Sequence, residues 1–403
     1  MVFAQYGNFF SVVLFTLFLI PAIVMNLLGR RIKYMGMILN VLMLVLFLGL
    51  NSLQMFQFLL FMICEMILIY LFLFLYGRYP KKWIYFGALF CSMIPIILIK
   101  LCVYTRFDML GFVGISYISF RIWQMIIEIR DGHIKKILLL DTLYFITFFP
   151  TLSSGPIDRY QRFMSDLNQV IPKKEYLHSY LAAGLRKILR GMIYKFGFAF
   201  LIQYIIMDHL PVEHTIQSTV IYMYAYTFYL FFDFAGYSNF AVGTSYILGI
   251  KVGENFNKPF LAKNMKEFWE RWHISLSQWF GDYIFKRFVL NTMRRKIFKS
   301  RKMAGRAGNM VTMLVMGIWH GPYLFYILYG LYEGLALVVT DIYLKNLFIK
   351  TEVLVDPVFL PYQVPVHLLA ACPYGSGGST SVSGLRFRAT GRSVLFPPVF
   401  AAF

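Results

Sequence analysis

The stretch Val311-Thr312-Met313-Leu314-Val315-Met316-Gly317-Ile318-Trp319-His320-Gly321 brings a histidine to the end of an apolar run that contains no charged residue before it. No charge follows between Pro322 and Leu331 either. An ionisable side chain at membrane depth is costly to keep, so its default interpretation is a functional site. The alternative is a core histidine whose ring is satisfied by a neighbouring backbone carbonyl. The stretch therefore predicts a membrane-embedded helix and makes His320 a candidate functional residue.

The composition outside this stretch is also that of a membrane protein. Of the 403 residues, 59% are hydrophobic and only 14% are charged, whereas soluble domains contain about 25% charged residues. Asn8–Leu28, Leu53–Tyr76 and Trp83–Val103 are long enough to span a bilayer, which takes ~20 residues. Further apolar stretches are shorter or interrupted, and we expect tilted, re-entrant or bent helices there: Gly36–Leu50, Phe107–Ile127, Ile137–Leu152, Thr219–Ala241 and Met310–Leu344. The predicted fold class is an all-α polytopic membrane protein.

Basic residues indicate how the chain is oriented. They follow the first, third and fifth apolar stretches, as Arg30, Arg31, Lys33, Arg78, Lys81, Lys82, Lys135 and Lys136. Because cytoplasmic loops collect Lys and Arg, we expect the N-terminus on the outer side of the membrane. Leu181–Phe200 has one basic and one apolar side, which predicts a helix lying in the plane of the membrane surface.

The net charge of +20 would suggest a nucleic-acid partner in a soluble protein. Here the basic residues lie between apolar stretches, so anionic lipid headgroups are the simpler partner and no nucleic acid is expected. An acidic protein is the other candidate partner. The most basic segment is Lys286–Arg306, and its candidate docking residues are Arg294, Arg295, Lys296 and Lys299.

The composition changes near residue 350. Six of the 15 prolines lie beyond that point, no lysine does, and residues 375–384 are rich in Gly and Ser. We therefore divide the chain into a transmembrane domain, residues 1–350, and a tail, residues 351–403. The tail is expected to be disordered or non-native.

A second histidine lies in the polar and aromatic segment Met265–Ser277. A single helix through this segment would place five side chains on one face: Trp269, Trp272, His273, Leu276 and Phe280. A buried aromatic face accounts for the tryptophans. It does not account for Glu267, Glu270 and Arg271, which have to pair internally at membrane depth.

The two histidines are 47 positions apart, and neither has a cysteine or carboxylate at ligand spacing. We therefore predict no metal site. The chain also has no Gly-x-Ser-x-Gly nucleophile elbow and no phosphate-binding glycine loop. What remains is a base that deprotonates a hydroxyl group, a task that neutral imidazole suits near pH 7.

Three aspartates lie in polar strings within apolar sequence. Asp131 ends the fifth apolar stretch, Asp158 follows Pro150, and Asp233 lies in Phe231–Ser238, which we expect to break the 219–241 stretch. We interpret the three mainly as ion-pair and turn residues that hold bent helices together.

Taken together, these strings resemble the membrane-bound O-acyltransferase family. The strings that carry the resemblance are Phe231–Ser238, Arg271–Ser277 and Trp319–Gly321. Finer signals favour the branch of the family that attaches D-alanine to teichoic acid: Gly114–Arg121, Glu128–Gly132, Thr151–Arg159 and Phe256–Phe260.

The resemblance implies a ring of tilted and re-entrant helices around a central funnel. It makes His320 the invariant family histidine and His273 the second one, both catalytic. With it we expect five substrate-binding residues: Trp319, Trp272, Ser275, Asp233 and Arg271.

The resemblance also implies the reaction partners. The donor would be D-alanine, held as a thioester on the phosphopantetheine arm of a small acidic carrier protein, so no cofactor would be bound permanently. The acceptor would be a hydroxyl on the outer face of the membrane, and other proteins of the D-alanylation system would pass the group to teichoic acid. The location would be the cell membrane of a Gram-positive bacterium.

Two other functions stay open from the sequence. Polysaccharide O-acetyltransferases of the same family share the strings around His273 and His320. A permease or flippase, a different class of protein, would use Asp233, Glu270 and His320 as a polar pathway. One departure from the family concerns Glu333, since relatives often carry a histidine in that segment.

Overall fold

The computed structural model describes residues 6–49, 52–102, 111–210 and 215–348. Within these segments the regular structure is helical, with one isolated antiparallel bridge between Phe256 and Trp272. The prediction of an all-α chain is confirmed for them. The predicted tail, residues 351–403, lies outside the described residues.

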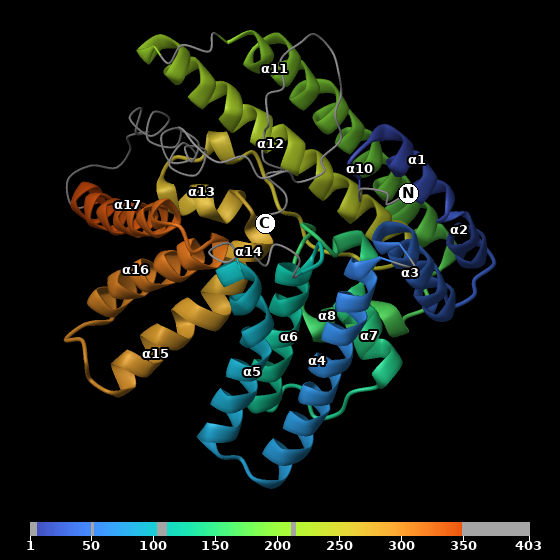
Figure 1. Cartoon of the computed structure of the whole chain (residues 1–403), viewed down its shortest axis with the longest axis horizontal. Coiled ribbons are helices and arrows are strands. Elements are labelled where there is room, and N and C mark those ends of the chain that lie inside the picture. Colours follow the sequence, from blue (N-terminus) through green and yellow to red (C-terminus); the bar gives the residue numbers. More distant parts are fainter. Residues whose placement is uncertain (1–5, 50–51, 103–110, 211–214, 349–403) are drawn as a thin grey trace.

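The first third of the chain forms α1 (Phe9–Leu17), α2 (Ile20–Leu27), α3 (Lys33–Leu48), α4 (Leu53–Arg78), α5 (Lys82–Leu101) and α6 (Ile115–Arg130). Side-chain caps begin two of these helices, because the oxygens of Asn8 and Ser52 accept the backbone N–H groups of Ser11 and Met55. The pair α4 and α5 extends beside α6, away from the centre of the molecule (Figure 1).

A segment of short helices follows, made of α7 (Leu139–Thr147), the 3-10 turn η2 (Phe149–Thr151) and α8 (Tyr160–Asn168). Its irregular backbone is satisfied by Arg121 of α6, which is only 1% exposed. The guanidinium donates to the carbonyl oxygens of Phe145, Ile146 and Thr151 at 3.1, 2.8 and 2.8 Å. Non-helical backbone is tolerated at membrane depth when protein groups satisfy it in this way.

The next helical run is longer than predicted. It comprises α9 (Lys173–Glu175), η3 (Tyr176–Leu181), α10 (Ala182–Met192), η4 (Ile193–Ala199), α11 (Phe200–Ile205) and η5 (Met207–His209). The helix predicted over Leu181–Phe200 is part of it. The whole run, Lys173–His209, is long and apolar enough to cross a membrane, which differs from the surface placement expected for the shorter segment.

The prediction that Phe231–Ser238 breaks its helix is wrong. Helix α12 continues without interruption over Ile216–Ile247. Its glycines instead allow neighbouring helices to pack closely on α12. A Cβ on Gly236 would lie 2.9 Å from the backbone nitrogen of Lys195, and one on Gly243 would lie 2.6 Å from the backbone oxygen of Gly184. Small residues let membrane helices approach this closely.

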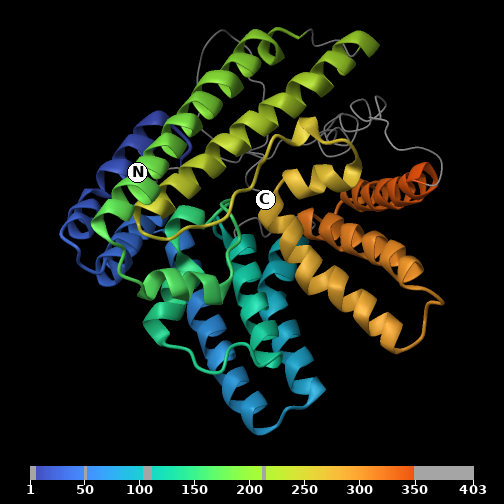
Figure 2. The same ribbon diagram turned by 180° about the vertical axis from the view of Figure 1, so that it is seen from behind.

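The last group consists of the 3-10 turn η6 (Pro259–Leu261), α13 (Met265–Arg271), α14 (Ile274–Phe280), η7 (Gly281–Phe285), α15 (Lys286–Arg294), α16 (Arg301–His320) and α17 (Leu324–Phe348). Figures 1 and 2 show this group, the α4–α6 group and the α10–α12 group extending in different directions, with α14 near the centre in both views.

Five helices of the described chain are long and apolar enough to cross a membrane: Phe9–Leu27, Leu53–Arg78, Lys82–Leu101, Lys173–His209 and Leu324–Leu344. Large apolar side chains on two of them are exposed, including Phe56 at 63%, Phe74 at 64% and Trp83 at 69%. Apolar surface of this extent is expected where helices face lipid. The inward or outward orientation of these helices stays a prediction.

Candidate active site

His320 is the last residue of α16, and its side chain is partly buried. Its ring stacks on that of Tyr326, with centroids 5.8 Å apart, and meets the ring of Tyr329 at 6.0 Å. Both tyrosines belong to α17. The imidazole therefore lies between a helix end and a wall of tyrosine side chains.

Glycines bring α16 and α17 close enough for this arrangement. A Cβ on Gly317 would lie 2.3 Å from the backbone carbonyl oxygen of Tyr326, and one on Gly330 would lie 2.5 Å from the backbone carbonyl oxygen of Met313. Gly321 ends α16 with an extended backbone, and a Cβ there would meet the Tyr326 ring at 2.7 Å. A larger residue at any of these positions would push the tyrosines away from His320.

Lys100 of α5 contacts the same helix end. Its ammonium donates to the His320 carbonyl oxygen at 3.1 Å and lies 5.6 Å from the Trp319 ring centroid. A cation at the C-terminal carbonyls of a helix is favourable because it faces the negative end of the helix dipole. The lysine fixes the end of α16 against α5.

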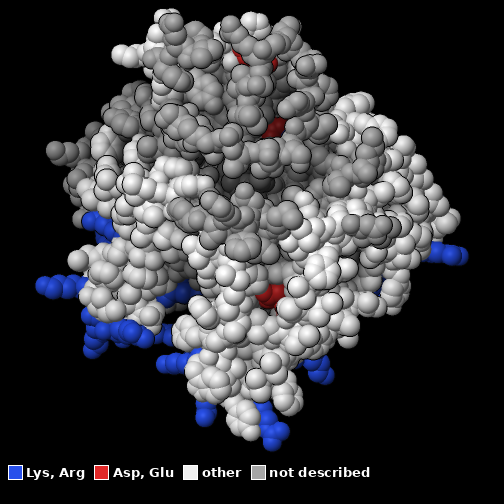
Figure 3. All heavy atoms as spheres, in the orientation of Figure 1, with Lys and Arg blue, Asp and Glu red and all other residues white. Residues whose placement is uncertain are grey.

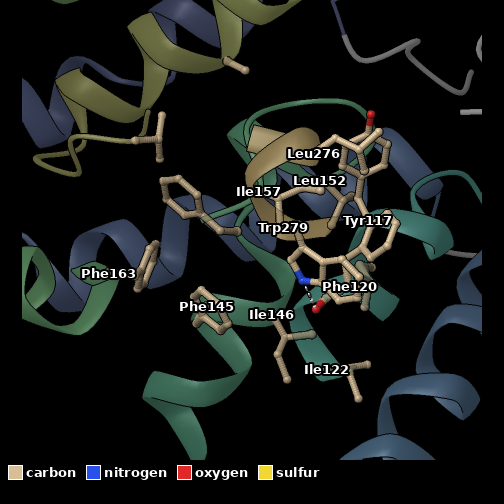
Figure 4. Close-up of a cluster of buried hydrophobic side chains, with 14 of the residues drawn as sticks. Tyr117, Phe120, Ile122, Phe145, Ile146, Leu152, Ile157, Phe163, Leu276 and Trp279 are labelled. Carbon is tan, nitrogen blue, oxygen red and sulfur yellow. Dashed lines mark hydrogen bonds between the residues drawn. The ribbon is translucent and has the colours of Figure 1, made fainter. Parts of the chain in front are cut away.

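Trp319 joins α16 to the interior of the molecule. Its ring lies 4.9 Å from that of Phe120 on α6. Trp279 of α14 packs at 4.5 Å on the same Phe120 ring and donates its indole N–H to the Phe120 oxygen at 3.2 Å (Figure 4). The indole nitrogen of Trp319 is buried and has no hydrogen-bond partner among the described residues.

His273 lies between two helices, not within one. It has a left-handed backbone, with φ of 43°, and separates α13 from α14. Two backbone hydrogen bonds stabilise this break between the helices. The Asn257 N–H donates to the Arg271 oxygen and the Ile274 N–H donates to the Asn255 oxygen, both at 2.9 Å. The prediction of one helical face through Trp269 and Phe280 is therefore wrong. Backbone groups that would bond within a continuous helix form hydrogen bonds with the loop before α13 instead.

The break turns the His273 ring into the protein core, where the residue is 3% exposed. Its Nε2 atom lies within hydrogen-bonding distance, 3.1 Å, of the Tyr117 hydroxyl on α6. The Phe234 ring of α12 packs against it at 4.9 Å. Nδ1 has no hydrogen-bond partner among the described residues. His273 is thus held in one orientation by rings from two other helices.

Helix α6 links the two histidines. Tyr117, which contacts His273, and Phe120, which contacts Trp319, are one helical turn apart and lie on the same side of α6. Figure 4 shows both side chains in the buried cluster with Leu276 and Trp279 of α14. The segments that carry His273 and His320 are therefore packed on a common support.

Among the predicted substrate-binding residues, Ser275 already has two protein partners. Its hydroxyl donates to the Asn255 side-chain oxygen at 2.6 Å and accepts the Ile157 N–H at 3.0 Å. Trp272 is buried, and its ring stacks on Phe268 at 5.5 Å. Contact of either residue with substrate stays a prediction.

Arg271 forms an ion pair on α13. Its guanidinium donates to Glu267 at 2.5 Å. The Lys263 backbone N–H and the Arg271 side chain together hold the pKa of Glu267 below its ordinary value. The predicted internal pairing in this segment is confirmed for these two residues.

The three aspartates also form ion pairs. Asp131 pairs with Arg287, Asp158 with Arg162, and Asp233 with Lys195. The interpretation of all three as ion-pair residues is confirmed. Asp233 is 5% exposed and its second oxygen has no partner among the described residues, so a substrate contact for it stays a prediction.

Sequence reasoning missed four residues around the histidines: Lys100, Tyr117, Tyr326 and Tyr329. Lys100 could have been found, since a lysine near the end of an apolar stretch carries the same signal as His320. The tyrosines gave no such signal, because tyrosine is common in this chain and only the tertiary contacts single them out.

The basic docking candidates lie together at the surface. Arg294, Arg295, Lys296 and Lys299 are all exposed, around the connection from α15 to α16. Figure 3 shows Lys and Arg side chains along the lower edge of one face, with few acidic groups visible there. In the described segments no group of three or more His, Cys, Asp and Glu side chains could hold a metal. The absence of a resident metal stays a prediction.

The chain is similar in sequence to known membrane acyltransferases. The model of the MBOAT, membrane-bound O-acyltransferase family matches residues 42–353. The teichoic acid D-alanyltransferase of Bacillus subtilis (strain 168) is 40% identical over 351 residues, which cover 84% of this chain and 89% of that protein. The same enzyme of Streptococcus thermophilus is 37% identical over 350 residues, covering 85% and 84%.

A more distant relative is a probable alginate O-acetylase of Pseudomonas aeruginosa. It is 30% identical over 229 residues, which cover 56% of this chain and 42% of that protein. The likeness to the D-alanyltransferases is therefore both higher in identity and longer.

Proposed function

Because this chain belongs to the membrane-bound O-acyltransferase family, we propose that it moves D-alanine from a carrier-protein thioester to a hydroxyl group in teichoic acid D-alanylation. Acyl transfer is the activity of the family, and the chain is a membrane acyltransferase. The D-alanyl group and the teichoic acid system come from the relatives that match at 37–40% identity over most of the chain.

The observation that supports the mechanism is an imidazole at the end of α16, beside two tyrosines of α17. We assign His320 as the base. The acceptor hydroxyl gives its proton to the imidazole as its oxygen attacks the thioester carbon. The C–S bond then breaks, and the leaving sulfur takes the proton back. A thioester is already activated, so this step needs no nucleotide.

Two effects would supply most of the rate acceleration. Holding the hydroxyl oxygen within ~3–3.5 Å of the thioester carbon removes the entropy cost of their encounter. Proton transfer to a positioned base contributes about 10²–10⁴-fold. Both require that the His320 ring keep one orientation, which the glycine-packed α16–α17 pair supports.

His273 has a supporting role in this proposal. Its ring is fixed by the Tyr117 hydroxyl and the Phe234 ring, so it acts as an oriented dipole that positions substrate or stabilises the oxyanion. Trp319, Trp272, Ser275, Asp233 and Arg271 are proposed substrate contacts. The helices are proposed to surround a central funnel in which donor and acceptor meet.

The donor is proposed to arrive on an acidic carrier protein whose phosphopantetheine arm enters the funnel. The exposed cations Arg294, Arg295, Lys296 and Lys299 support a docking site for it, since opposite charge speeds encounter. Membrane lipids and other proteins of the D-alanylation system complete the set of partners. The proposed location is the cell membrane of a Gram-positive bacterium, with several membrane spans.

The test uses membrane vesicles containing the full chain, lipoteichoic acid and carrier protein loaded with labelled D-alanine. We expect labelled ester to form with the wild-type chain and not with His320→Ala. A labelled acetyl donor, run in parallel, tests the polysaccharide O-acetyltransferase alternative, which the alginate O-acetylase relative favours. Movement of substrate across the membrane without ester formation would support the permease alternative instead.

A further inference from the structure

Glu333 is a carboxylic acid inside a candidate membrane span, Leu324–Leu344 of α17, and is only 3% exposed. One of its oxygens accepts the indole N–H of Trp269 at 3.1 Å. In the described part of the chain no Lys, Arg or His side chain lies within ion-pair distance of it. An acid kept in such a setting is costly, so a functional role is the default interpretation.

The other buried acids differ from Glu333 in their partners or their place. Asp141 pairs with Lys33 at 2.7 Å, and Asp158 and Asp233 pair with Arg162 and Lys195. Each of those carboxylates already has a protein cation. Glu65 has no ion pair among the described residues, but it lies on α4, which packs mainly against α5 and α6.

The position of Glu333 relates it to His320. Tyr329 precedes it by one turn on α17, so the two side chains lie on the same side of the helix. The Tyr329 ring is also one of the two tyrosine rings beside His320. The Glu333 backbone is therefore about 6 Å along α17 from that tyrosine. The α-ammonium of an alanyl group is two bonds of about 1.5 Å from its carbonyl carbon.

A cationic donor group needs an anion at this place. Lys100 puts a positive charge against the His320 carbonyl oxygen, and this charge opposes a second cation in a low-dielectric site. The Trp269 N–H holds one carboxylate oxygen of Glu333, and a carboxylate can accept further hydrogen bonds. The Trp269 N–H therefore holds the Glu333 carboxyl group in one orientation, in which it can accept a hydrogen bond from a cation.

We propose that Glu333 binds the α-ammonium of the aminoacyl donor and so selects aminoacyl thioesters over uncharged acyl thioesters. Trp269 is the positioning residue that holds its carboxylate. The inference rests on the proposed function and adds the part of the substrate that this residue recognises. Acetyl and hydroxyacyl groups lack the ammonium, so they would gain no ion pair with the buried carboxylate and bind less well than an aminoacyl group.

The experiment compares two donors on the same carrier protein, D-alanyl and D-lactyl thioesters, which differ in one group, an ammonium against a hydroxyl. Transfer to lipoteichoic acid is measured in vesicles with the full chain. The wild-type chain is expected to prefer D-alanyl. Glu333→Gln should lower kcat/KM for D-alanyl by about 30-fold or more, the effect expected on removing one partner of a buried charge pair. D-lactyl transfer should change less than about 3-fold.

Two further variants keep the test decisive if Glu333→Gln does not fold. Trp269→Phe removes the N–H that orients the carboxylate, along with part of the indole, and should shift the D-alanyl to D-lactyl ratio in the same direction by less. Glu333→Asp retains the charge and should keep most of the preference. Glu65→Gln, a buried acid on α4, is the matched control and should leave the ratio unchanged.

Equal losses for both donors in Glu333→Gln would make the residue structural and overturn the inference. So would a wild-type chain that transfers the two donors equally well. Either result leaves D-alanyl transfer by the wild-type chain, and thus the proposed function, intact. A wild-type chain that transfers neither donor would overturn the proposed function itself.

Discussion

The surroundings of His320 and His273 differ in nearly every respect. His320 is partly buried at a helix end, beside two tyrosines from the next helix. His273 is 3% exposed, lies in a left-handed turn and contacts Tyr117 and Phe234. A base has to exchange protons with a substrate, whereas a positioning group has to stay fixed. The difference supports the proposal that His320 transfers the proton and His273 orients the reacting groups.

The largest expected effect comes from His320→Ala. Because the variant removes the proposed base, transfer should fall by about 10²–10⁴-fold. The protein should remain in the membrane at normal abundance, since His320 is the last residue of α16 and only partly buried. Labelled D-alanyl transfer and immunodetection in membranes measure the two quantities. Transfer near the wild-type rate would contradict the proposal that His320, and not His273, is the base.

His273→Ala should have a smaller effect on activity and a larger one on stability. The loss of an oriented dipole costs up to about 10²-fold in rate. The Tyr117 hydroxyl would also lose its partner in a buried site, which costs about 1–3 kcal/mol. Tyr117→Phe alone would leave His273 Nε2 without its partner, so the matched control is the double variant His273→Ala with Tyr117→Phe, which lacks both partners. Thermal unfolding in detergent should rank the double variant above His273→Ala, and the reverse order would contradict the assignment.

Gly317→Ala tests the His320 side of the comparison alone. The added methyl group would meet the Tyr326 oxygen at 2.3 Å, so α16 and α17 have to separate. Overpacking of this kind costs about 1–3 kcal/mol. Transfer and thermal stability should both fall. Gly305→Ala on the same helix has open space around its Cβ position and should behave as wild type. Equal behaviour of the two variants would show that the close helix contact is dispensable.

The smallest effect is expected from charge reversal at the docking surface, Arg294, Arg295, Lys296 and Lys299 to Glu. Carrier encounter should slow several-fold at low salt and lose its salt dependence. The kcat should not change, because neither histidine is affected. Arg30→Glu with Arg31→Glu is a control for general surface charge. Carrier titrations at two ionic strengths give KM and kcat. An unchanged KM would contradict carrier docking at this surface and favour its contact with lipid headgroups.

Much of the molecule could be predicted from sequence because lipid imposes simple rules. The lengths of the apolar stretches predicted helices, and ionisable residues within or beside these stretches identified His320 and His273 as candidates. The same rule, applied to Lys100 and Glu333, would have found both. The features that were mispredicted or missed depend on partners distant in sequence. The break at His273 is held by Asn255 and Asn257, and its ring partner Tyr117 is 156 residues away.

Glycine was the other source of error. In α12 the string around Gly236 was expected to interrupt a helix, because glycine is flexible and a poor helix former. Its lack of a side chain instead allows α12 to pack on the Lys195 backbone. Local sequence does not distinguish a glycine that ends a helix from one that lets two helices touch, since the difference lies in the neighbour.

The hydrogen bonds of Arg121 have a consequence for how the protein is made. Their acceptor carbonyls belong to Phe145, Ile146 and Thr151, which are 24 to 30 residues later in the chain. When the ribosome has produced α6 only, this guanidinium has none of these acceptors, and a charge without partners is strongly disfavoured in lipid. We therefore expect α6 to reach its final place only after the segment that carries these carbonyls has been made, so that the two are packed into the protein together.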